Sequence, residues 1–134
     1  MADNSTAMRR VLVCDDDVTI SEVVAIILVD SNMAEVYTIP DCDNIIEKIE
    51  ELQPSLIFMD NKIPPLGGVI ATQIIKNHPI HKTIPVVYFT ANRDIDQLAK
   101  NAGADYTLAK PFSISELEEV VNVAFKSHKD PIKD

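Results

Sequence analysis

Hydrophobic and polar positions along the chain predict five strands that alternate with five helices. Short, nearly continuous apolar runs occur at residues 10–14, 34–39, 55–59, 84–89 and 105–109. Runs of this kind are typical of parallel strands that are buried on both faces. Between the runs, apolar residues recur at helical spacing, so each connection is expected to contain an amphipathic helix. The alternation predicts parallel strands joined by right-handed crossovers, and therefore a three-layer α/β fold.

Local signals place the ends and the buried faces of the expected helices. Asp41 is expected to cap the second helix, and Ser113 with Glu116 has the spacing of a capping box. Gly103 is expected to end the fourth helix in a left-handed conformation. The expected apolar faces consist of Ile20, Val23, Val24, Ile27 and Leu28; Ile45, Ile46, Ile49 and Leu52; Val69, Ile70 and Ile74; Ile95, Leu98, Ala99 and Ala102; and Ile114, Leu117, Val121, Ala124 and Phe125.

Length and charge narrow the class of protein. The chain has 134 residues, 46% of them hydrophobic, which suits one globular domain at residues 9–128 with tails at 1–8 and 129–134. It carries 12 Lys and Arg against 21 Asp and Glu, a net charge of −9. Because this surface would repel a phosphate backbone, direct nucleic-acid binding is not expected. No apolar run approaches the about 20 residues of a membrane span, and the start lacks a secretory signal, so a cytoplasmic protein without membrane contact is expected.

Cysteines and histidines form no evident site. Cys14 and Cys42 lack metal-type spacing and are expected to be reduced structural thiols. His78, His81 and His128 have no second ligand at metal spacing and are expected to be solvated.

Polar side chains follow four of the five expected strands. They are Asp15, Asp16 and Asp17 after the first run, Asp60 after the third, Thr90 after the fourth and Lys110 after the fifth. Each alone has a simpler explanation, because an Asp or Thr after a strand is often a helix N-cap. Since parallel strands end at the same edge of a sheet, however, all of them are expected to lie close together.

Such a group of side chains indicates phosphoryl chemistry. Neighbouring carboxylates repel one another and require a cation, and their hard oxygen ligands suit Mg²⁺. A hydroxyl and an ammonium group beside the metal suit the oxygens of a phosphoryl group. The residues by themselves do not show which atom attacks.

Six ordered segments give the chain a resemblance to a known family. They are residues 11–17 (VLVCDDD), 56–60 (LIFMD), 64–68 (PPLGG), 86–91 (VVYFTA), 103–105 (GAD) and 110–112 (KPF). Together they resemble the receiver (CheY-like) domain of two-component response regulators over residues 9–126. The resemblance implies a flavodoxin-like (βα)5 fold, with a doubly wound five-stranded parallel sheet in the strand order 2-1-3-4-5.

The resemblance also implies a role for each polar residue. Asp60 is the implied phosphoacceptor. The other implied roles are Mg²⁺ binding by Asp15, Asp16 and Asp60 with the backbone carbonyl of Lys62, a hydrogen bond from Thr90 to the phosphoryl group, and an ion pair from Lys110, which precedes a cis bond to Pro111. The implied donor is a phosphohistidine on a sensor histidine kinase or a histidine phosphotransfer protein.

The implied output is a change in binding rather than turnover of a substrate. The domain would catalyse its own phosphorylation and dephosphorylation, and would then switch a downstream protein target or relay the phosphoryl group. The surface of the fourth helix, fifth strand and fifth helix is the implied partner or dimer face.

Two departures from the family pattern bear on this output. Thr107 occupies the position where receivers usually carry Tyr or Phe, and Tyr106 is displaced by one residue, so its side chain is expected on the opposite face of the strand. The family pattern of an aromatic side chain coupled to Thr90 is therefore not met at this position. Lys62, two residues after Asp60, either shields the phosphoryl group or is a solvated loop lysine.

Two alternatives stay open. In a phosphatase of the haloacid dehalogenase type, Asp15 would be the nucleophile and Asp17 the acid, with later roles for Thr90 and Lys110, but Asp60 would then be unexplained. A receiver-shaped interaction module that never accepts phosphate is the other alternative.

Overall fold

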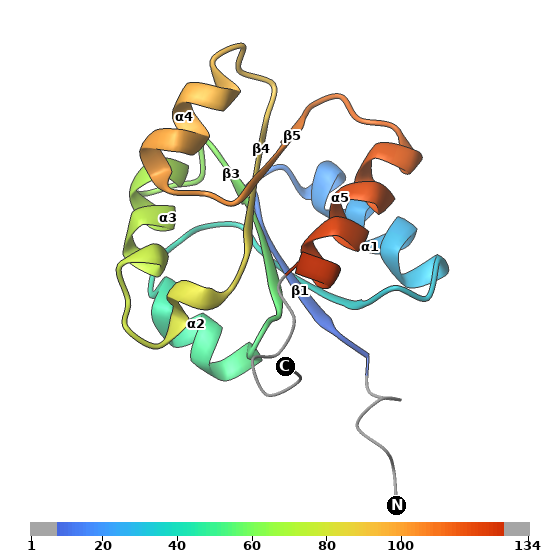
Figure 1. Cartoon of the computed structure of the whole chain (residues 1–134), viewed down its shortest axis with the longest axis horizontal. Helices are drawn as coiled ribbons and strands as arrows, with labels where there is room; N and C mark the ends of the chain where they lie inside the picture. Colours follow the sequence, from blue (N-terminus) through green and yellow to red (C-terminus); the bar gives the residue numbers. More distant parts are fainter. Residues whose placement is uncertain (1–7, 128–134) are drawn as a thin grey trace, which may run out of the picture.

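The computed structural model describes residues 8–127 as one five-stranded parallel sheet with helices on both faces (Figure 1). The strand order β2-β1-β3-β4-β5 confirms the predicted fold and the implied order. The predicted tails and the domain end at residue 128 lie outside the described residues, apart from Met8. In chain order, the elements are β1 (Arg10–Cys14), α1 (Val18–Asp30), β2 (Glu35–Ile39), α2 (Ile45–Leu52), β3 (Leu56–Asp60), α3 (Gly68–Lys76), the short 3-10 helix η2 (His81–Thr83), β4 (Val86–Thr90), α4 (Ile95–Ala102), β5 (Tyr106–Ala109) and α5 (Ile114–Ser127).

Burial differs between the central and the edge strands. Every residue of β3 and β4 is buried, and so are the last four residues of β1. No residue of β2 is buried, and in β5 only Leu108 is. The prediction of burial on both faces is therefore wrong for the runs at 34–39 and 105–109. Their strands form the two edges of the sheet, where one side of each strand has no neighbour.

Alternating side chains of the central strands divide the core into two halves. On one face, α2, α3 and α4 cover residues such as Leu12, Ile57 and Tyr88; on the other face, α1 and α5 cover residues such as Phe58 and Phe89 (Figure 1). The Phe58 and Phe89 rings meet edge to face, with centroids 5.5 Å apart. Each half of the core thus anchors the sheet from its own side.

Helix α3 turns a different face to the sheet than its apolar residues predicted, because Ile70 and Ile74 are exposed. In α1 and α5, one predicted residue each is exposed, Val23 and Ile114, while the rest of each predicted face packs against the core. The buried positions of α3 are Gly68, Ala71, Thr72 and Ile75. Small side chains at these positions let the helix backbone pack close to the sheet, which turns two of the large apolar side chains outward.

Helix ends follow local signals in two cases out of three. Gly103 ends α4 with a positive φ of 82°, as predicted. The prediction for Asp41 is wrong, because Asn44 is the N-cap of α2 and the Asp41 side chain accepts a hydrogen bond from the Asp43 N–H instead.

Both cysteines are buried and unpaired, as expected. Within residues 8–127, no helix is both long enough and apolar enough to cross a bilayer.

The capping box before α5 is present and can be tested by mutation. Ser113 Oγ accepts from the Glu116 N–H at 3.0 Å, and Glu116 Oε1 accepts from the Ser113 N–H at 2.8 Å. We expect Ser113→Ala to lower the free energy of unfolding by about 1 kcal/mol. The Glu116 N–H would lose its acceptor, and the hydrogen bond from the Ser113 N–H to Glu116 would lose its fixed geometry. Urea unfolding measures the change. Ser115→Ala, in the same turn, is the control, and an equal loss in both variants would contradict the assignment.

Candidate functional site

The predicted polar residues meet at the edge of the sheet where the strands end. Asp15 directly follows β1, Asp60 and Thr90 are the last residues of β3 and β4, and Lys110 directly follows β5. Asp15, Asp60 and Thr90 are only 2%, 7% and 5% exposed, whereas Asp16 is exposed. The parallel register of four neighbouring strands therefore collects residues that lie far apart in the sequence.

The ammonium group of Lys110 joins two of these strand ends. Its Nζ lies 2.6 Å from Asp15 Oδ2 and 2.9 Å from Asp60 Oδ1, and it donates a hydrogen bond to each. The same nitrogen lies 4.4 Å from the centroid of the Phe89 ring. The Lys110–Pro111 peptide bond is cis, as the resemblance implied. One mostly buried cation is thus held between two carboxylates and an aromatic ring.

Burial and charge shift the pKa values of this group. Burial raises the pKa of Asp15 above its ordinary value; the hydrogen bond from Lys110 opposes the shift, and the charge of Asp60 adds to it. Burial by itself would lower the pKa of Lys110, but the hydrogen bonds and charges of the two carboxylates outweigh it and raise that pKa. Lys110 therefore stays a cation, while the two carboxylates repel each other across it.

Each of three polar side chains at the strand ends accepts a hydrogen bond from the backbone N–H two residues later in the chain. The Asp17 N–H donates to Asp15 Oδ1 at 2.9 Å, and the Lys62 N–H donates to Asp60 Oδ2 at 2.9 Å. The same pattern places the Asn92 N–H 3.2 Å from Thr90 Oγ1. The tight turn after each strand thus fixes the direction of its polar side chain.

An acidic cluster at this edge has the chemistry of a magnesium site. Asp15, Asp16 and Asp60 each offer a carboxylate oxygen, and these oxygens lie within 4.8 Å of one another. Hard oxygen donors on one exposed and two buried carboxylates fit Mg²⁺, which prefers such ligands and keeps several waters. Asp17 does not share this role, because its Oδ1 caps α1 by accepting from the Thr19 and Ile20 N–H groups.

Two residues beside the site were not singled out from the sequence. Tyr88 is a buried residue of β4, and its hydroxyl donates a hydrogen bond to Oδ1 of Asn61. A buried tyrosine usually finds a partner for its hydroxyl, so the Tyr in the apolar run 84–89 was the available signal. The partner, 27 residues away, could not be read from that run.

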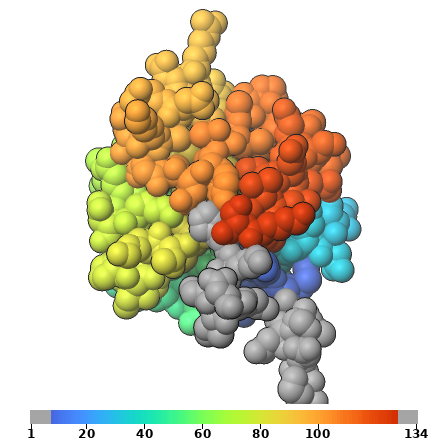
Figure 2. All heavy atoms as spheres, in the orientation of Figure 1, coloured from blue at the N-terminus to red at the C-terminus, as the bar shows by residue number. Residues whose placement is uncertain are grey.

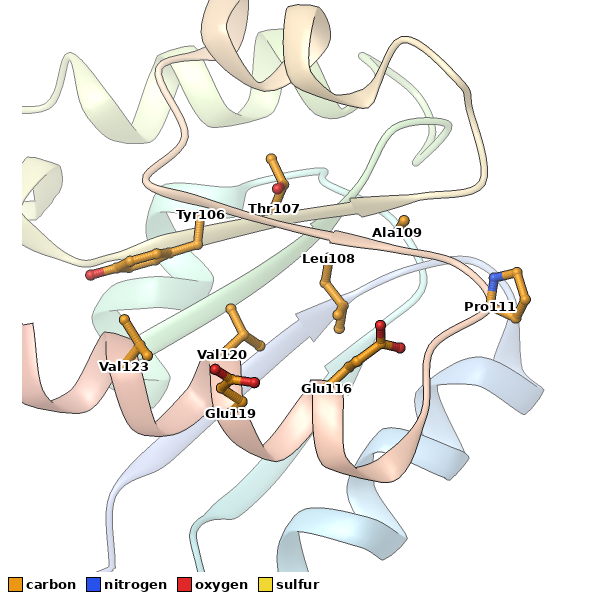
Figure 3. Close-up of a pocket in the computed structure, with 9 residues that line it drawn as sticks. All are labelled: Tyr106, Thr107, Leu108, Ala109, Pro111, Glu116, Glu119, Val120 and Val123. Carbon is orange, nitrogen blue, oxygen red and sulfur yellow. The ribbon is translucent and has the colours of Figure 1, made fainter.

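The position of the usual receiver aromatic residue has no aromatic side chain in this chain. Thr107 is exposed and pairs with Tyr88 in the register between β4 and β5. Tyr106 points to the opposite side of β5 from Thr107 (Figure 3). It packs against the half of the core that α1 and α5 cover. The predicted opposite orientation of Tyr106 is therefore confirmed.

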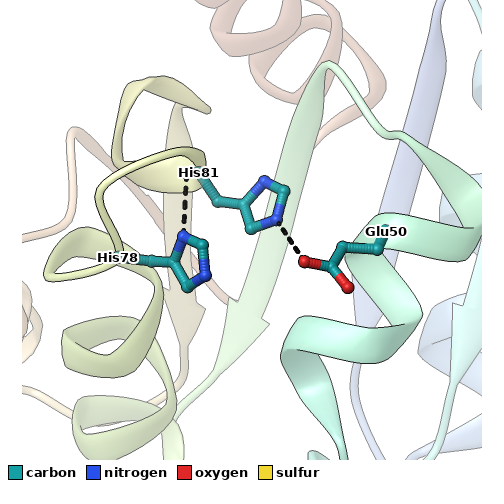
Figure 4. A group of neighbouring side chains, drawn as sticks. All are labelled: Glu50, His78 and His81. Atoms are coloured by element: carbon teal, nitrogen blue, oxygen red, sulfur yellow. Dashed lines mark hydrogen bonds and ion pairs between the residues drawn. The ribbon is translucent and has the colours of Figure 1, made fainter.

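A second cluster of ligand-type side chains lies near the amino ends of β3 and β4 (Figure 4). His81 Nε2 is 3.3 Å from Glu50 Oε2, and the rings of His78 and His81 stack with centroids 4.5 Å apart. The side chain of His81 is only 13% exposed, so the prediction of a solvated histidine is wrong for it. His128 lies outside the described residues.

The geometry of this second cluster supports packing rather than metal binding. The two imidazole planes are only 28° apart in a stack, so their in-plane lone pairs do not converge on one point. His78 Nδ1 also accepts hydrogen bonds from the Ile80 and His81 N–H groups. These contacts hold the loop before β4 against α2.

Comparisons with known proteins show the family of this chain. The family model described as the response regulator receiver domain matches residues 11–122. The transcriptional regulatory protein PdtaR of Mycobacterium tuberculosis is 33% identical over 124 residues, which cover 91% of this chain and 59% of the relative. The phosphate regulon transcriptional regulatory protein PhoB of Escherichia coli is 32% identical over 111 residues, covering 81% of this chain and 48% of the relative.

Solved structures show the same architecture. A putative response regulator from Chloroflexus aurantiacus superposes with a TM-score of 0.82 at 28% identity, covering 88% of this chain and 98% of that chain. The chemotaxis protein CheY4 of Vibrio cholerae gives a TM-score of 0.79 at 26% identity, covering 89% of this chain and 100% of that chain.

The curated relatives are longer proteins. This chain spans about half to three fifths of their length, and some of them are named as transcriptional or DNA-binding regulators. The expectation that this chain does not contact nucleic acid therefore stays a prediction. The match over residues 11–122 and the CheY-like structures show that the chain belongs to the response regulator receiver domain family of two-component systems, whose domains are generally not turnover enzymes.

Proposed function

We propose that this chain accepts a phosphoryl group on Asp60 from a phosphohistidine of a sensor histidine kinase or a histidine phosphotransfer protein. The observation that carries the proposal is the ammonium group of Lys110, which is shared between Asp15 and Asp60 at the end of the sheet. A cation held beside the carboxylate favours phosphoryl transfer, because the reaction brings the negative carboxylate and the negative phosphoryl group together. A cytoplasmic location, alongside the kinase, is part of the proposal.

In the proposed reaction, a carboxylate oxygen of Asp60 attacks phosphorus in line. The new O–P bond forms as the N–P bond of the phosphohistidine breaks, and the electron pair of that bond stays on the imidazole nitrogen of the donor. Lys110 compensates the charge of the phosphoryl oxygens, and the Lys62 N–H keeps the carboxylate oriented. Thr90, at the end of the next strand, supplies a hydroxyl donor.

The acidic cluster supports a divalent cation at this site. Asp15, Asp16 and Asp60, with the backbone carbonyl of Lys62, would hold Mg²⁺. When bound, the ion offsets the charge of the acidic cluster and of the incoming phosphoryl group. Burial raises the pKa of Asp15, and a cation bound at its carboxylate would favour the charged form.

Neither alternative explains the site as well. A phosphatase of the haloacid dehalogenase type would need Asp17 as its acid, but the Asp17 carboxylate accepts two backbone hydrogen bonds as the cap of α1. An interaction module that never accepts phosphate would not need the shared contacts of Lys110 with two buried carboxylates.

The first helix offers a surface beside the site for the phosphoryl donor. Val18, Ile26 and Val29 are more than half exposed and lie on one side of α1, and Val18 directly follows the cap residue Asp17. Exposed apolar patches of this kind commonly mark protein interaction sites. Of the three residues, only Val18 lies at the end of α1 beside the site, and this end supports docking of the kinase or transfer protein next to Asp60.

The proposed output surface is formed by α4, β5 and α5, which share one face of the molecule (Figure 2). A shallow pocket of about 560 Å³ lies between β5 and α5 on this face (Figure 3). Tyr106, Val120 and Val123 give it apolar walls, and Glu116 and Glu119 give it an acidic side. This chemistry suits a partner segment with apolar and basic side chains, or a second copy of the chain if the domain dimerises.

Phosphorylation by a small donor tests the proposal. We expect the full chain, incubated with Mg²⁺ and acetyl phosphate, to gain one phosphoryl group by intact mass. Asp60→Asn should abolish the gain, because the attacking oxygen is replaced by an amide, and a chelator should abolish it in the wild type. Asp96→Asn, an exposed carboxylate in the first turn of α4, is the control that should keep it.

Each other outcome of this experiment is informative. A wild-type chain that gains no phosphoryl group, or an Asp60→Asn variant that still gains one, would contradict the proposal. Turnover of a generic phosphomonoester that depends on Asp15 would support the phosphatase instead.

A further inference from the structure

Among residues 8–127, the largest fully buried side chain lies beside the proposed phosphoacceptor. Tyr88 is 0% exposed at the middle of β4, and its hydroxyl donates to the side-chain carbonyl of Asn61. Asn61 directly follows Asp60. A phenol in the core therefore contacts the first residue of the loop that leaves the site.

The backbone of Asn61 is held from a second direction. Its carbonyl accepts a hydrogen bond from the Gly68 N–H at 2.8 Å. A Cβ at Gly68 would lie 2.3 Å from the carbonyl oxygen of Asp60 and 2.9 Å from the Tyr88 hydroxyl, so only glycine fits here. Tyr88, Asn61 and Gly68 thus form one packed connection between β4, the end of β3 and the start of α3.

This connection sets the position of the peptide group that touches the Asp60 carboxylate. The N–H of Lys62, in the peptide bond that follows Asn61, donates to Asp60 Oδ2 at 2.9 Å. Because the carbonyl of that same peptide bond is bound by Gly68 and the Asn61 side chain by Tyr88, the plane of the peptide has little freedom. The remaining oxygen of Asp60 faces Lys110 as a result.

The Tyr88 hydroxyl remains a hydrogen-bond donor at physiological pH. Burial, with a smaller contribution from the charge of Asp60, raises the pKa of Tyr88 to about 12. The contact with Asn61 therefore does not depend on pH near neutrality.

We propose that Tyr88 is a positioning residue for phosphoryl transfer, whose hydroxyl acts through Asn61 to hold the Lys62 N–H against the Asp60 carboxylate. The proposal rests on the proposed function of Asp60. Removal of the hydroxyl leaves the ring in place but frees Asn61, so the carboxylate loses its fixed orientation. A misplacement of the order of 1 Å is enough to slow a reaction severely.

The test compares Tyr88→Phe, Asn61→Ala and the double variant with the wild-type chain. The measurements are the phosphorylation rate at saturating acetyl phosphate and Mg²⁺, the hydrogen exchange of the Lys62 amide, and thermal unfolding. We expect each single variant to slow phosphorylation about tenfold and to lose protection at Lys62, with little change in the acetyl phosphate concentration for half-maximal rate. The double variant should be no slower than the slower single variant, because both changes break the same hydrogen bond.

The matched control is Tyr37→Phe, which removes the hydroxyl of a partly exposed tyrosine bound to Glu35. Its phosphorylation rate should equal that of the wild type. A Tyr88→Phe rate within about twofold of the wild type, or multiplying effects in the double variant, would overturn the proposal. If Tyr88→Phe does not fold, an unchanged rate in Asn61→Ala overturns it.

Failure of the proposed function is a separate result. If the wild-type chain gains no phosphoryl group, the role of Asp60 fails, and the positioning proposal for phosphoryl transfer fails with it. If the Lys62 amide still loses protection in Tyr88→Phe, that result would show only that Tyr88 and the Lys62 peptide group are structurally connected.

Discussion

Lys110→Met should lose nearly all phosphorylation, with a rate at least about a hundredfold below that of the wild type. The variant keeps most of the side-chain length but removes the cation that lies 2.6 Å from Asp15 and 2.9 Å from Asp60. Without this cation, the carboxylate of the proposed phosphoacceptor Asp60 and the incoming phosphoryl oxygens would repel each other more strongly. The rate with acetyl phosphate and Mg²⁺, followed by intact mass, measures the effect.

The same variant should also be less stable. Removing one partner of a buried ion pair leaves two carboxylates without their cation and costs about 3 kcal/mol. We expect added Mg²⁺ to restore part of this loss, because it would bind the same carboxylates. Urea unfolding with and without Mg²⁺ separates the two contributions.

Lys76→Met is the matched control for Lys110→Met. Lys76 is also a mostly buried lysine, 15% exposed against 14% for Lys110, and its Nζ lies 2.6 Å from Asp105. It connects α3 to the start of β5 and has no contact with the acidic cluster. Lys76→Met should therefore lose stability but keep the phosphorylation rate. Equal loss of phosphorylation in the two variants would show that the role of Lys110 is structural only.

Gly68→Ala is the second substitution with a large expected effect. The added Cβ would lie 2.3 Å from the carbonyl oxygen of Asp60 and 3.0 Å from Cα of Asn61, and neither backbone can move without displacing the site. We expect a loss of about 1–3 kcal/mol in unfolding free energy from the clash. The phosphorylation rate should fall about a hundredfold, because the displaced segment carries Asp60, the proposed phosphoacceptor.

Gly103→Ala separates these two effects. Gly103 has a positive φ of 82°, and the nearest atoms to its Cβ position are 3.8 Å away on Lys76, so the substitution strains the backbone without a clash. It should cost about 1–2 kcal/mol and leave phosphorylation unchanged. If Gly68→Ala lost no more activity than Gly103→Ala, close packing at Gly68 would not matter for the site.

The elements of this protein were largely predictable because their signals are local. Apolar runs gave the positions of all five strands to within two residues at either end, and the residues after those runs were the ones that meet at the sheet edge. The Ser113 and Gly103 helix ends were predicted for the same reason, since each depends on neighbours within one turn. The prediction that Asp41 caps α2 was wrong because three residues, 42–44, separate it from the first turn of the helix.

Contacts between distant residues had no such signal. Nothing near Tyr88 in the sequence indicates Asn61 as its partner, and nothing near Gly68 indicates that a Cβ would meet the backbone of Asp60. The face that α3 turns to the sheet also differs from the one its large apolar residues predicted, because small residues allow the closer approach.

The sequence by itself determined the alternation of strands and helices, the family and the polar residues that follow the strands, because these depend on residue type and order along the chain. Only the tertiary structure decided that β2 and β5 lie at the edges, that Lys110 is shared by two carboxylates, and that Tyr88 supports the residue after Asp60. These features depend on strand register and on the distance between packed layers, which arise only when segments far apart in the chain pack together.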